Sequence, residues 1–550
     1  MSKRALVIGS GFGGISLAIR LQAMGFSTTI LEKLDKPGGR GYQKSVEVEG
    51  IGTFKFDMGP TVITVPHFIE ELFSLKKGDI PSPKDTHFTD ESLAAIQDGH
   101  AILSTKKKGK KTLTSPTFAA TNNTQKYVDI VPVSPFYRIY FTDGTFFDYD
   151  GDYQNTIDQI LALTSSQEEV EGFKRFHQEA LEVFQRGFLQ LGFTHFSTPW
   201  DMISVIPDLL NLDVVRTLFG YVQKYFKHEK TQQVFSFEPL LIGGNPYSVP
   251  AIYVMIHFVE KIWGVHYAMG GTGKLVNGLV QKFEELGGSI RYNSEVEKLL
   301  IENGKATGVI LKNGERIEST IVCSNADYAH TYNQLVQQPK LINSPFKVKH
   351  LTTYSMSLFV IYFAFKHDPN IPLALRHHNI ILSGQYEEEL EALFKTGDLH
   401  PKFSQYLHIP TYTDPSMAPK GYHTAYTLVC VPNKKIGNHD WDNISEQFSE
   451  KVLTFIEEKG YIPQLKKRLV HTSFINPNYF ESTLNSIYGN AFGVAPLLRQ
   501  SAFFRPHNAS GDIINLYCVG ASYQPGAGVP AVMMSAKMTA KIIAKNHNVT

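Results

Sequence analysis

The residues whose spacing most clearly indicates chemistry are three glycines in LVIGSGFGGISLAIRLQAMG (residues 6–25). Gly9, Gly11 and Gly14 satisfy the pattern GxGxxG. In a dinucleotide-binding turn the first glycine permits a tight bend, the second lets the backbone approach a pyrophosphate, and the third lets helix pack on strand. The N–H groups that open the following helix then favour a phosphate. The pattern predicts a strand, a phosphate-binding turn and a helix.

An acidic residue lies where such a turn needs one. Glu32 ends the next apolar stretch, 18 residues after Gly14 (32 minus 14). A carboxylate there accepts hydrogen bonds from a ribose that carries no 2′-phosphate. The following residues, KLDKPGGRGYQ, contain a second glycine turn, Gly38 and Gly39, and then Arg40. Because amides and a guanidinium suit the rest of a longer diphosphate ligand, the sequence favours FAD over NAD.

The C-terminal part supplies another glycine-rich turn. It reads NLYCVGASYQPGAGVPAVMMSAKMTAKIIAK, a short strand, a turn and a helix that Pro530 would open at its first position. The amides from Gly526 to Val529, with the positive end of that helix, would stabilise charge on a reduced isoalloxazine. In FKFDMGPTVIT, Gly59 and Pro60 fix a turn near the flavin ring. The candidate cofactor-binding residues are Gly9, Gly11, Phe12, Gly13, Gly14, Glu32, Lys33, Gly39, Arg40, Gly59, Pro60, Thr61, Val296, Gly520, Gly526, Gly528, Val529 and Pro530.

Composition excludes some classes of partner. The 550 residues include 53 Lys+Arg and 52 Asp+Glu, a net charge of +1, so no global field attracts nucleic acid. Three cysteines are too far apart for a CxxC pair, and no metal site is expected. The chain enters its glycine turn at once, which leaves no room for a cleavable leader, and no run of about 18 apolar residues occurs. We therefore expect a cytoplasmic protein, with peripheral membrane attachment left open.

The order of predicted elements indicates an α/β protein, α+β overall, with a Rossmann-like nucleotide-binding domain and an inserted substrate domain. Residues 269–327 predict a turn, an amphipathic helix and four short strands separated by hairpin signals. The expected divisions are 1–75, 266–335 and 501–550 for the FAD-binding domain, 127–265 and 336–500 for the substrate domain, and 76–126 for an insertion.

Two segments raise the question of a membrane. Residues 76–126 are polar and Lys/Ser/Thr-rich without sustained periodicity, which predicts a flexible insertion. A rival interpretation treats KKKGKK (106–111) as a contact for anionic lipid. Residues 200–226 carry many large apolar side chains and few charges, as in a segment that lies in a bilayer interface. A buried helix pair broken at Pro207 is an equal alternative.

The chain resembles the bacterial and fungal type of phytoene desaturase, a family of FAD-dependent carotenoid desaturases, over most of its length outside 76–126. The departures from the family pattern are Ser522, Tyr523 and Gln524 in place of Gly-Thr-His, and Ala531 in place of a frequent glycine. Both lie beside the expected flavin, so they leave the substrate and the number of steps open. The matching segments are GSGFGGISLAIRLQAMG, EKLDKPGGR, FDMGPTVIT, VSPFYRIYFTDGTFFDYD, GGNPYSVPAIYVMIHFVEKIWGVHYAMGGTG, FRPHN and NLYCVGASYQPGAGVP.

The resemblance implies the FAD-binding fold of the flavin amine oxidases and carotenoid desaturases, with non-covalent FAD. It implies a hydrophobic polyisoprenoid or carotenoid substrate, peripheral contact with a membrane surface, and oxygen or a quinone as electron acceptor. Desaturation removes an allylic hydride to the flavin and a vicinal proton, forming conjugated double bonds. A hydrocarbon offers only apolar area for recognition. Each Å² of that area removed from water contributes about 25 cal/mol to the free energy of binding. The candidate substrate-lining residues, for each of which core packing is an equal alternative, are Phe136, Tyr137, Tyr247, Trp263 and Tyr267.

The vicinal proton would need an acceptor. Asp150 in FFDYDGD, with Asp148 and Asp152 beside it, is the catalytic candidate because an apolar pocket would raise its pKa. A turn at a strand end explains the same residues without catalysis, and water or the reduced flavin are alternative acceptors. Arg505 and His507 in FRPHN also match the family, with bracing of the C-terminal turn as their expected role.

Other functions stay open at this point. The chain would also suit a related flavoprotein that acts on a different carotenoid as an isomerase, ketolase, saturase or C30 desaturase. A same-fold amine oxidase is a further alternative, and it would need an aromatic cage around a polar amine. A non-catalytic lipid carrier is the alternative from another class. The intact glycines with Glu32 and Arg40 argue against a carrier, because a carrier needs no flavin site.

Overall fold

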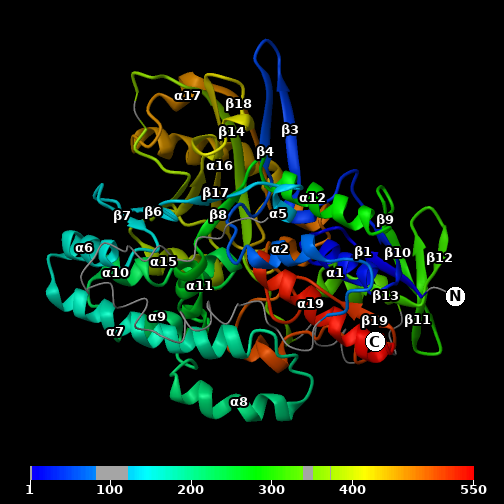
Figure 1. The fold of residues 1–550 in the computed structure, drawn as a ribbon. Helices are drawn as coiled ribbons and strands as arrows, with labels where there is room; N and C mark the ends of the chain where they lie inside the picture. Colours follow the sequence, from blue (N-terminus) through cyan, green and yellow to red (C-terminus); the bar gives the residue numbers. More distant parts are fainter. Residues whose placement is uncertain (1–2, 82–121, 338–350, 372, 550) are drawn as a thin grey trace.

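The computed structural model describes residues 3–81, 122–337, 351–371 and 373–549. The polybasic stretch at 106–111 lies outside the described residues. Two sheets organise the described chain, one five-stranded and one seven-stranded (Figure 1). Helices and short hairpins surround them.

The five-stranded sheet is entirely parallel, in the order β19-β13-β1-β2-β9. Its strands come from three widely separated parts of the sequence. They are β1 (Arg4–Ile8), β2 (Ser27–Leu31), β9 (Ser289–Arg291), β13 (Ile321–Ser324) and β19 (Leu516–Cys518). Parallel sheets need cover on both faces, which explains why the central strands β1 and β13 and the edge strand β19 are mostly apolar and buried.

Alternate residues of β1 pack on opposite faces of this sheet. Ala5 and Val7 belong to the core that includes α1 (Phe12–Ala23), α12 (Thr272–Glu285) and α19 (Val529–Asn546). Leu6 and Ile8 belong to a second core, shared with an antiparallel three-stranded sheet. The strands of that small sheet are β10 (Val296–Glu302), β11 (Lys305–Leu311) and β12 (Arg316–Glu318).

The seven-stranded sheet, in the order β18-β14-β17-β16-β15-β6-β7, also has two different faces. From β14, Phe359 and Phe363 pack with helix α16 (Trp441–Glu458), whereas Val360 and Tyr362 face the main core. The period of two in a strand produces this separation. The strands are β6 (Tyr137–Tyr140), β7 (Phe146–Tyr149), β14 (Ser357–Lys366), β15 (His378–Ile381), β16 (Gln405–His408), β17 (Tyr422–Val431) and β18 (Leu469–Ile475).

The remaining strands form two short pairs: β3 (Gln43–Val48) with β4 (Gly52–Asp57), and β5 (Ile130–Val133) with β8 (Val265–Ala268). Half of the remaining α-helices, α6 to α11, lie between β7 and β8 in the sequence. The other α-helices are α2 (His67–Ser74), α5 (Asn122–Gln125), α6 (Tyr153–Thr164), α7 (Gln167–Phe184), α8 (Pro199–Asn211), α9 (Leu218–Val222), α10 (Glu229–Val234), α11 (Met255–Trp263), α13 (Tyr328–His330), α15 (Tyr386–Glu391), α17 (Leu465–Arg468) and α18 (Pro477–Ser482).

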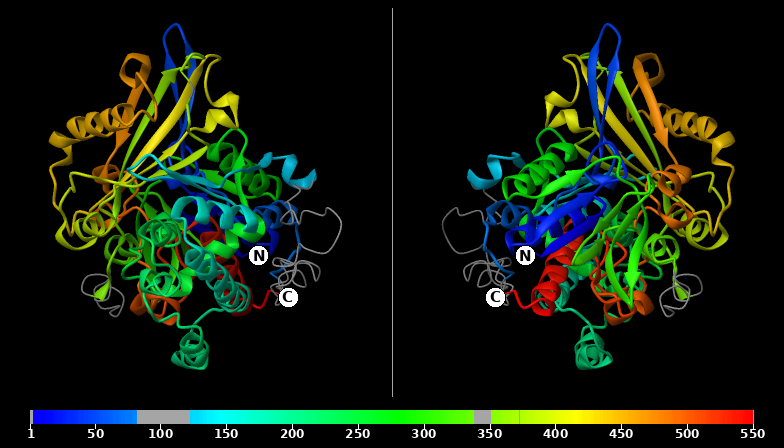
Figure 2. Two further views of the ribbon diagram at one scale, coloured as in Figure 1. Left: turned by 90° about the vertical axis from the view of Figure 1, so that its left-hand side faces the viewer. Right: turned by 90° about the vertical axis from the view of Figure 1, so that its right-hand side faces the viewer.

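Helix α8 lies at the periphery, at the end of the molecule opposite the β3–β4 hairpin (Figure 2). It continues through Pro207 as one helix and is capped by Thr198, whose hydroxyl accepts from Asp201 N–H. The alternative of a buried, broken helix pair therefore does not describe it. One proline removes one backbone hydrogen bond, which this capped and exposed helix tolerates. Among the described residues, no helix is long and apolar enough to cross a membrane.

The fold depends on a close approach between α1 and the turn before it. A Cβ on Gly14 would lie 2.1 Å from the carbonyl oxygen of Gly9, a distance that no side chain can adopt. We expect Gly14→Ala to push α1 away from β1 and to reduce the free energy of unfolding by about 1–3 kcal/mol, as overpacking does. Thermal unfolding measures this change. Gly511→Ala, where a Cβ would meet nothing within 4 Å, is the matched control; equal midpoints for the two variants would contradict the argument.

Candidate active site

The turn between β1 and α1 forms one wall of a cavity of about 560 Å³. Gly9 adopts a left-handed conformation at φ +89°, and Gly11 caps the start of α1. A Cβ on Gly11 would lie 2.8 Å from Asn325 Nδ2, so any other residue here would displace a side chain that also lines the cavity. The free N–H groups of the first helical turn therefore face the cavity, as phosphate binding requires.

Glu32 follows β2 and lies at the same wall. Its side chain is 5% exposed and accepts hydrogen bonds from Ser10 N–H to Oε2 and from Leu34 N–H to Oε1, both at 2.8 Å. The Ser10 hydroxyl donates to Oε2 as well. A carboxylate has about four acceptor sites, so these three bonds leave capacity for a ribose hydroxyl. The same contacts fix the carboxylate's orientation.

The second glycine turn places a buried cation in the cavity wall. Arg40 Nη2 donates to Ser486 Oγ at 2.7 Å, whereas its Nε has no hydrogen-bond partner among the described residues. Burial lowers the pKa of Arg40, and the nearby Asp327 opposes that shift. A buried guanidinium with an unused N–H beside a cavity fits a phosphate anion.

The C-terminal turn closes the cavity from another side. Gly528 is the N-cap of α19 at φ +103°, Val529 is the first helical residue and Pro530 the second. The sequence predicted Pro530 at the first position; both positions lack an intrahelical partner for their N–H, so proline fits either. Arg505 braces this turn, because its Nη2 donates to the carbonyl of Ala521 at 2.7 Å and its Nε to that of Tyr523 at 3.0 Å.

The cavity brings together most of the predicted cofactor-binding residues, while Gly14 lies behind the turn. An acceptor carboxylate, a guanidinium N–H and two helix N-termini converge there, and this donor set fits a flavin dinucleotide. Predicted residues that line the cavity are Gly9, Gly11, Phe12, Gly13, Glu32, Lys33, Gly39, Arg40, Gly59, Pro60, Thr61, Val296, Gly520, Gly526, Gly528, Val529, Pro530 and Tyr137.

The rest of the lining is mostly apolar and comes from the seven-stranded sheet and from the helices between β7 and β8. Long aliphatic and aromatic side chains predominate, with no ion pair between them. This part of the cavity suits a hydrophobic ligand. Apolar residues that line it are Phe188, Leu240, Leu241, Ile242, Ile252, Met255, Ile256, Val259, Leu358, Val360 and Leu428.

Two carboxylates that sequence reasoning missed lie in this apolar part. Glu260 on α11 and Glu238 after α10 are both buried and both line the cavity. Glu260 Oε1 accepts from the Tyr137 hydroxyl at 2.6 Å, and Glu238 Oε1 from the Tyr149 hydroxyl at 2.7 Å. Burial raises the pKa of Glu260 to about 8 and raises that of Glu238 as well. The only sequence signal was a lone acid inside the apolar stretches IHFVEKIW and FSFEPLLIGG.

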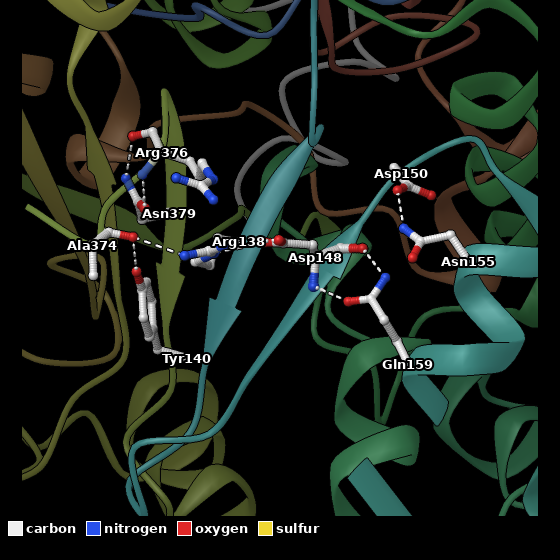
Figure 3. Close-up of polar contacts among 9 residues, drawn as sticks. All are labelled: Arg138, Tyr140, Asp148, Asp150, Asn155, Gln159, Ala374, Arg376 and Asn379. Atoms are coloured by element: carbon white, nitrogen blue, oxygen red, sulfur yellow. Dashed lines mark hydrogen bonds and ion pairs between the residues drawn. The ribbon is translucent and has the colours of Figure 1, made fainter. Parts of the chain in front are cut away.

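Asp150, the predicted proton acceptor, does not line the cavity. It follows β7 and accepts from Asp152 N–H at 2.9 Å. It also accepts from Asn155 Nδ2 (Figure 3). Asp148 pairs with Arg138 at 2.6 Å, and Asp152 caps α6. Burial raises the pKa of Asp150. These contacts match the alternative of a turn at a strand end.

Of the five predicted substrate-lining residues, only Tyr137 lines the cavity. Tyr247 stacks on Phe219 with ring centroids 4.2 Å apart. The others pack in the surrounding core: Phe136 on Tyr149, Trp263 on Phe184 and Phe188, and Tyr267 on His377. Aromatic residues were expected at the ligand because of their size, and aliphatic residues occupy most of that surface instead.

The family departures at 522–524 also point away from the cavity. Gln524 Nε2 donates to the carbonyls of Phe196 and Ala502, at 3.1 and 2.9 Å. Tyr523 is buried and its hydroxyl contacts Thr331. None of the three side chains lines the cavity, whereas Ala531 does.

A network of hydroxyls and imidazoles borders the cavity at Thr61. The Thr61 hydroxyl contacts those of Tyr426 at 2.7 Å and Tyr406 at 3.1 Å, and Tyr406 contacts His378 Nδ1 at 2.6 Å. Burial lowers the pKa of His378 and of His408, which keeps both neutral. The absence of a metal stays a prediction, because the possible ligand atoms of three buried histidines lie within 4.8 Å of one another: His377, His378 and His408.

Comparison with known proteins identifies this architecture. Residues 12–544 match the family described as flavin containing amine oxidoreductase. The chain is 38% identical to a phytoene desaturase (lycopene-forming) of Pseudescherichia vulneris, over 98% of this chain and 99% of that protein. It is 34% identical to a phytoene desaturase (neurosporene-forming) of Rhodobacter capsulatus, over 98% and 94%. A solved cyclohexylamine oxidase of Brevibacterium oxydans shares the fold, with TM-score 0.55, 12% identity and full coverage of both chains (100% and 100%).

These matches confirm the predicted fold class and resemblance, and they identify a flavin cofactor. The chain therefore belongs to the flavin-containing amine oxidoreductases and, among them, to the family of the bacterial phytoene desaturases.

Proposed function

We propose that the protein binds FAD non-covalently and uses it to desaturate a carotenoid precursor such as phytoene. The observation that carries this proposal is one continuous cavity, polar at the glycine turns and mostly apolar between the second sheet and its helices. The relatives named phytoene desaturases support it. When bound, the flavin accepts the hydride that leaves the substrate. Oxygen or a quinone then takes the electrons.

The polar part of the cavity would hold the dinucleotide. The N-terminus of α1 binds the pyrophosphate, Glu32 accepts from the adenosine ribose, and Arg40 donates its free Nε–H to a phosphate. Amides around Gly528 at the start of α19 stabilise negative charge on the flavin. The six-part division of the chain is retained as part of this proposal; the pairing of β1 with β13, and of β13 with β19, supports it.

The apolar part would hold the hydrocarbon. Aliphatic side chains such as Ile252, Ile256 and Val259 exclude water from the reacting carbons and hold the chain by apolar area alone. Each CH₂ group that leaves water contributes about 0.8 kcal/mol. Apart from Glu238, Glu260 and several tyrosines, the walls of this part are mainly aliphatic, and this large aliphatic area favours a carotenoid over a small polar amine. Because the side chains of residues 522–524 point elsewhere, they give no support to a different carotenoid reaction.

Helix α8 would attach the protein to the membrane that stores the substrate. Trp200 is 76% exposed and Leu210 59% exposed, and with Ile203 and Ile206 they form one stripe of the helix. Soluble proteins rarely leave such a stripe uncovered. Gly192, a few residues before α8, lines the cavity, so a substrate that leaves the bilayer at α8 is already near its site.

Desaturation is tested with purified flavin-bearing protein and phytoene in phosphatidylcholine vesicles. We expect new visible absorption bands with resolved fine structure in the extracted lipids, whose positions count the conjugated double bonds. The same assay with a C30 precursor or a soluble amine tests the alternatives. Turnover of the amine, with phytoene unchanged, would contradict the proposal.

Glu32→Ala is expected to weaken retention of FAD. Hydrogen bonds to a charged group contribute about 1.5–3 kcal/mol, so FAD should bind about ten- to a hundredfold more weakly. Flavin fluorescence released on dilution measures the change. Glu49→Ala, on the exposed β3–β4 turn, is the matched control. A Glu32→Ala protein that keeps its full complement of flavin would show that this carboxylate is not the ribose acceptor.

Replacing Trp200, Ile203 and Leu210 together with serine should abolish cosedimentation with vesicles. Each large apolar side chain that enters the bilayer contributes about 1.5–3 kcal/mol, and serine contributes none of it. Flavin content should not change, because α8 does not line the cavity. Leu161→Ser, at an exposed leucine on α6, is the control. Unchanged vesicle binding by the triple variant would exclude α8 as the attachment surface.

A further inference from the structure

Glu260 is a carboxylate with one oxygen held and the other free. It lies on α11 and is 1% exposed, yet it lines the cavity. Oε1 accepts from the Tyr137 hydroxyl at 2.6 Å. Oε2 is buried and has no hydrogen-bond partner among the described residues. A buried acceptor without a partner destabilises a fold by about 1–3 kcal/mol, so its retention in an apolar wall calls for a functional reason.

The surroundings of Glu260 are apolar where it meets the cavity. Ile256 and Val259, on the same helix, line the cavity beside it. No Lys or Arg forms an ion pair with it within the described chain. Tyr137 holds Oε1, so Oε2 is the oxygen of this cavity-lining residue that has no hydrogen-bond partner among the described residues.

Contacts connect this wall to the part of the cavity that contains predicted flavin-binding residues. The Tyr137 ring lies 6.0 Å from the His378 ring, between centroids. His378 contacts Tyr406, and Tyr406 contacts Thr61, which lines the cavity after the Gly59-Pro60 turn. Glu260 and Thr61 therefore line one cavity and are joined by a continuous series of side-chain contacts.

We propose that Glu260 is the catalytic base of the desaturation, with Oε2 taking the vicinal proton while the Tyr137 hydroxyl stabilises the carboxylate. This role rests on the proposed function. In the step, the C–H bond next to the allylic carbon breaks, its proton forms an O–H bond on Oε2, and its electron pair becomes the new π bond. The hydride of the allylic carbon carries two electrons to the flavin, so the substrate is oxidised and the flavin reduced.

The acid–base properties of Glu260 suit this role. Burial raises its pKa to about 8, and the Tyr137 hydrogen bond opposes the shift. A general base works best when its pKa lies near the working pH. The base must be ionised to act, so kcat/KM should rise as pH increases through about 8 and level off above it.

Other titratable groups around Glu260 come from every neighbouring element. Tyr137 on β6 and Tyr149 on β7 are hydroxyl donors whose pKa burial raises, so they stay protonated. Burial lowers the pKa of Lys261, on the same helix, to about 8. Burial also lowers the pKa of His257, well below its usual range. The further groups are Glu238 after α10, His177 on α7, and Tyr406 and His378 on the second sheet.

The test uses the purified holoenzyme with phytoene in vesicles. Glu260→Gln keeps the size of the side chain and removes the base, so kcat should fall about 10²- to 10⁴-fold with flavin content unchanged. Asp150→Asn tests the alternative proton acceptor. Glu284→Gln, at an exposed position on α12, is the matched control. Retained kcat in Glu260→Gln, or its loss in Asp150→Asn alone, would overturn the role.

Tyr137→Phe gives a second readout that a structural role would not produce. Without the hydroxyl the carboxylate loses its stabilising donor, so the pKa of Glu260 should rise and the ascending limb of the pH profile should move to higher pH. Infrared pH titration should show one protonated carboxyl band that follows the same shift and is missing in Glu260→Gln. If neither the ascending limb of the pH profile nor the carboxyl band shifts in Tyr137→Phe, the role of Glu260 as the base is overturned. A wild-type protein that leaves phytoene unchanged would refute the proposed function, whereas an active wild type beside an equally active Glu260→Gln refutes only the base.

Discussion

The contact between the first turn of α1 and the carbonyl of Gly9 is the constraint on which the rest of the site depends. Because no side chain intervenes at Gly14, α1 lies against β1 and its N-terminus reaches the cavity. The same position brings α1 between α12 and α19 in one core. The C-terminal turn, which begins α19, is thereby held at the wall of the same cavity.

The cavity combines two electrostatic environments. At the glycine turns, charges have polar partners: Glu32 accepts from Ser10 and Leu34, and Arg40 donates to Ser486. In the apolar part, Glu260 accepts one hydrogen bond among the described residues, from the Tyr137 hydroxyl, and burial raises its pKa. The first arrangement suits a ligand that is charged throughout the reaction. The second suits a ligand that is neutral and becomes charged only during it.

Sequence reasoning located the nucleotide-binding residues because their function follows from local backbone. Glycines, a helix start and an acid at fixed spacing need no knowledge of distant contacts. The residues of the apolar part could not be located in this way. Tyr137, Val360 and Ile256 meet only because β6, β14 and α11, far apart in sequence, form one wall. Asp150 lay in a matching segment, but it follows β7 and does not line the cavity, and its carboxylate accepts from Asp152 N–H and Asn155 Nδ2.

The five-stranded parallel sheet can form completely only late in the synthesis of the chain. Strand β1 is made first, whereas β19, at the edge of the same sheet, is separated from it by about five hundred residues. At translation rates of about 5–20 residues per second, some 25 to 100 seconds pass between them. Throughout that interval the apolar strand β1 exists without the last strand of its sheet and without α19. Ribosome-bound intermediates of this chain therefore expose apolar surface that chaperones bind, and the cavity lacks the wall formed by Gly526 to Pro530 until that segment has been made.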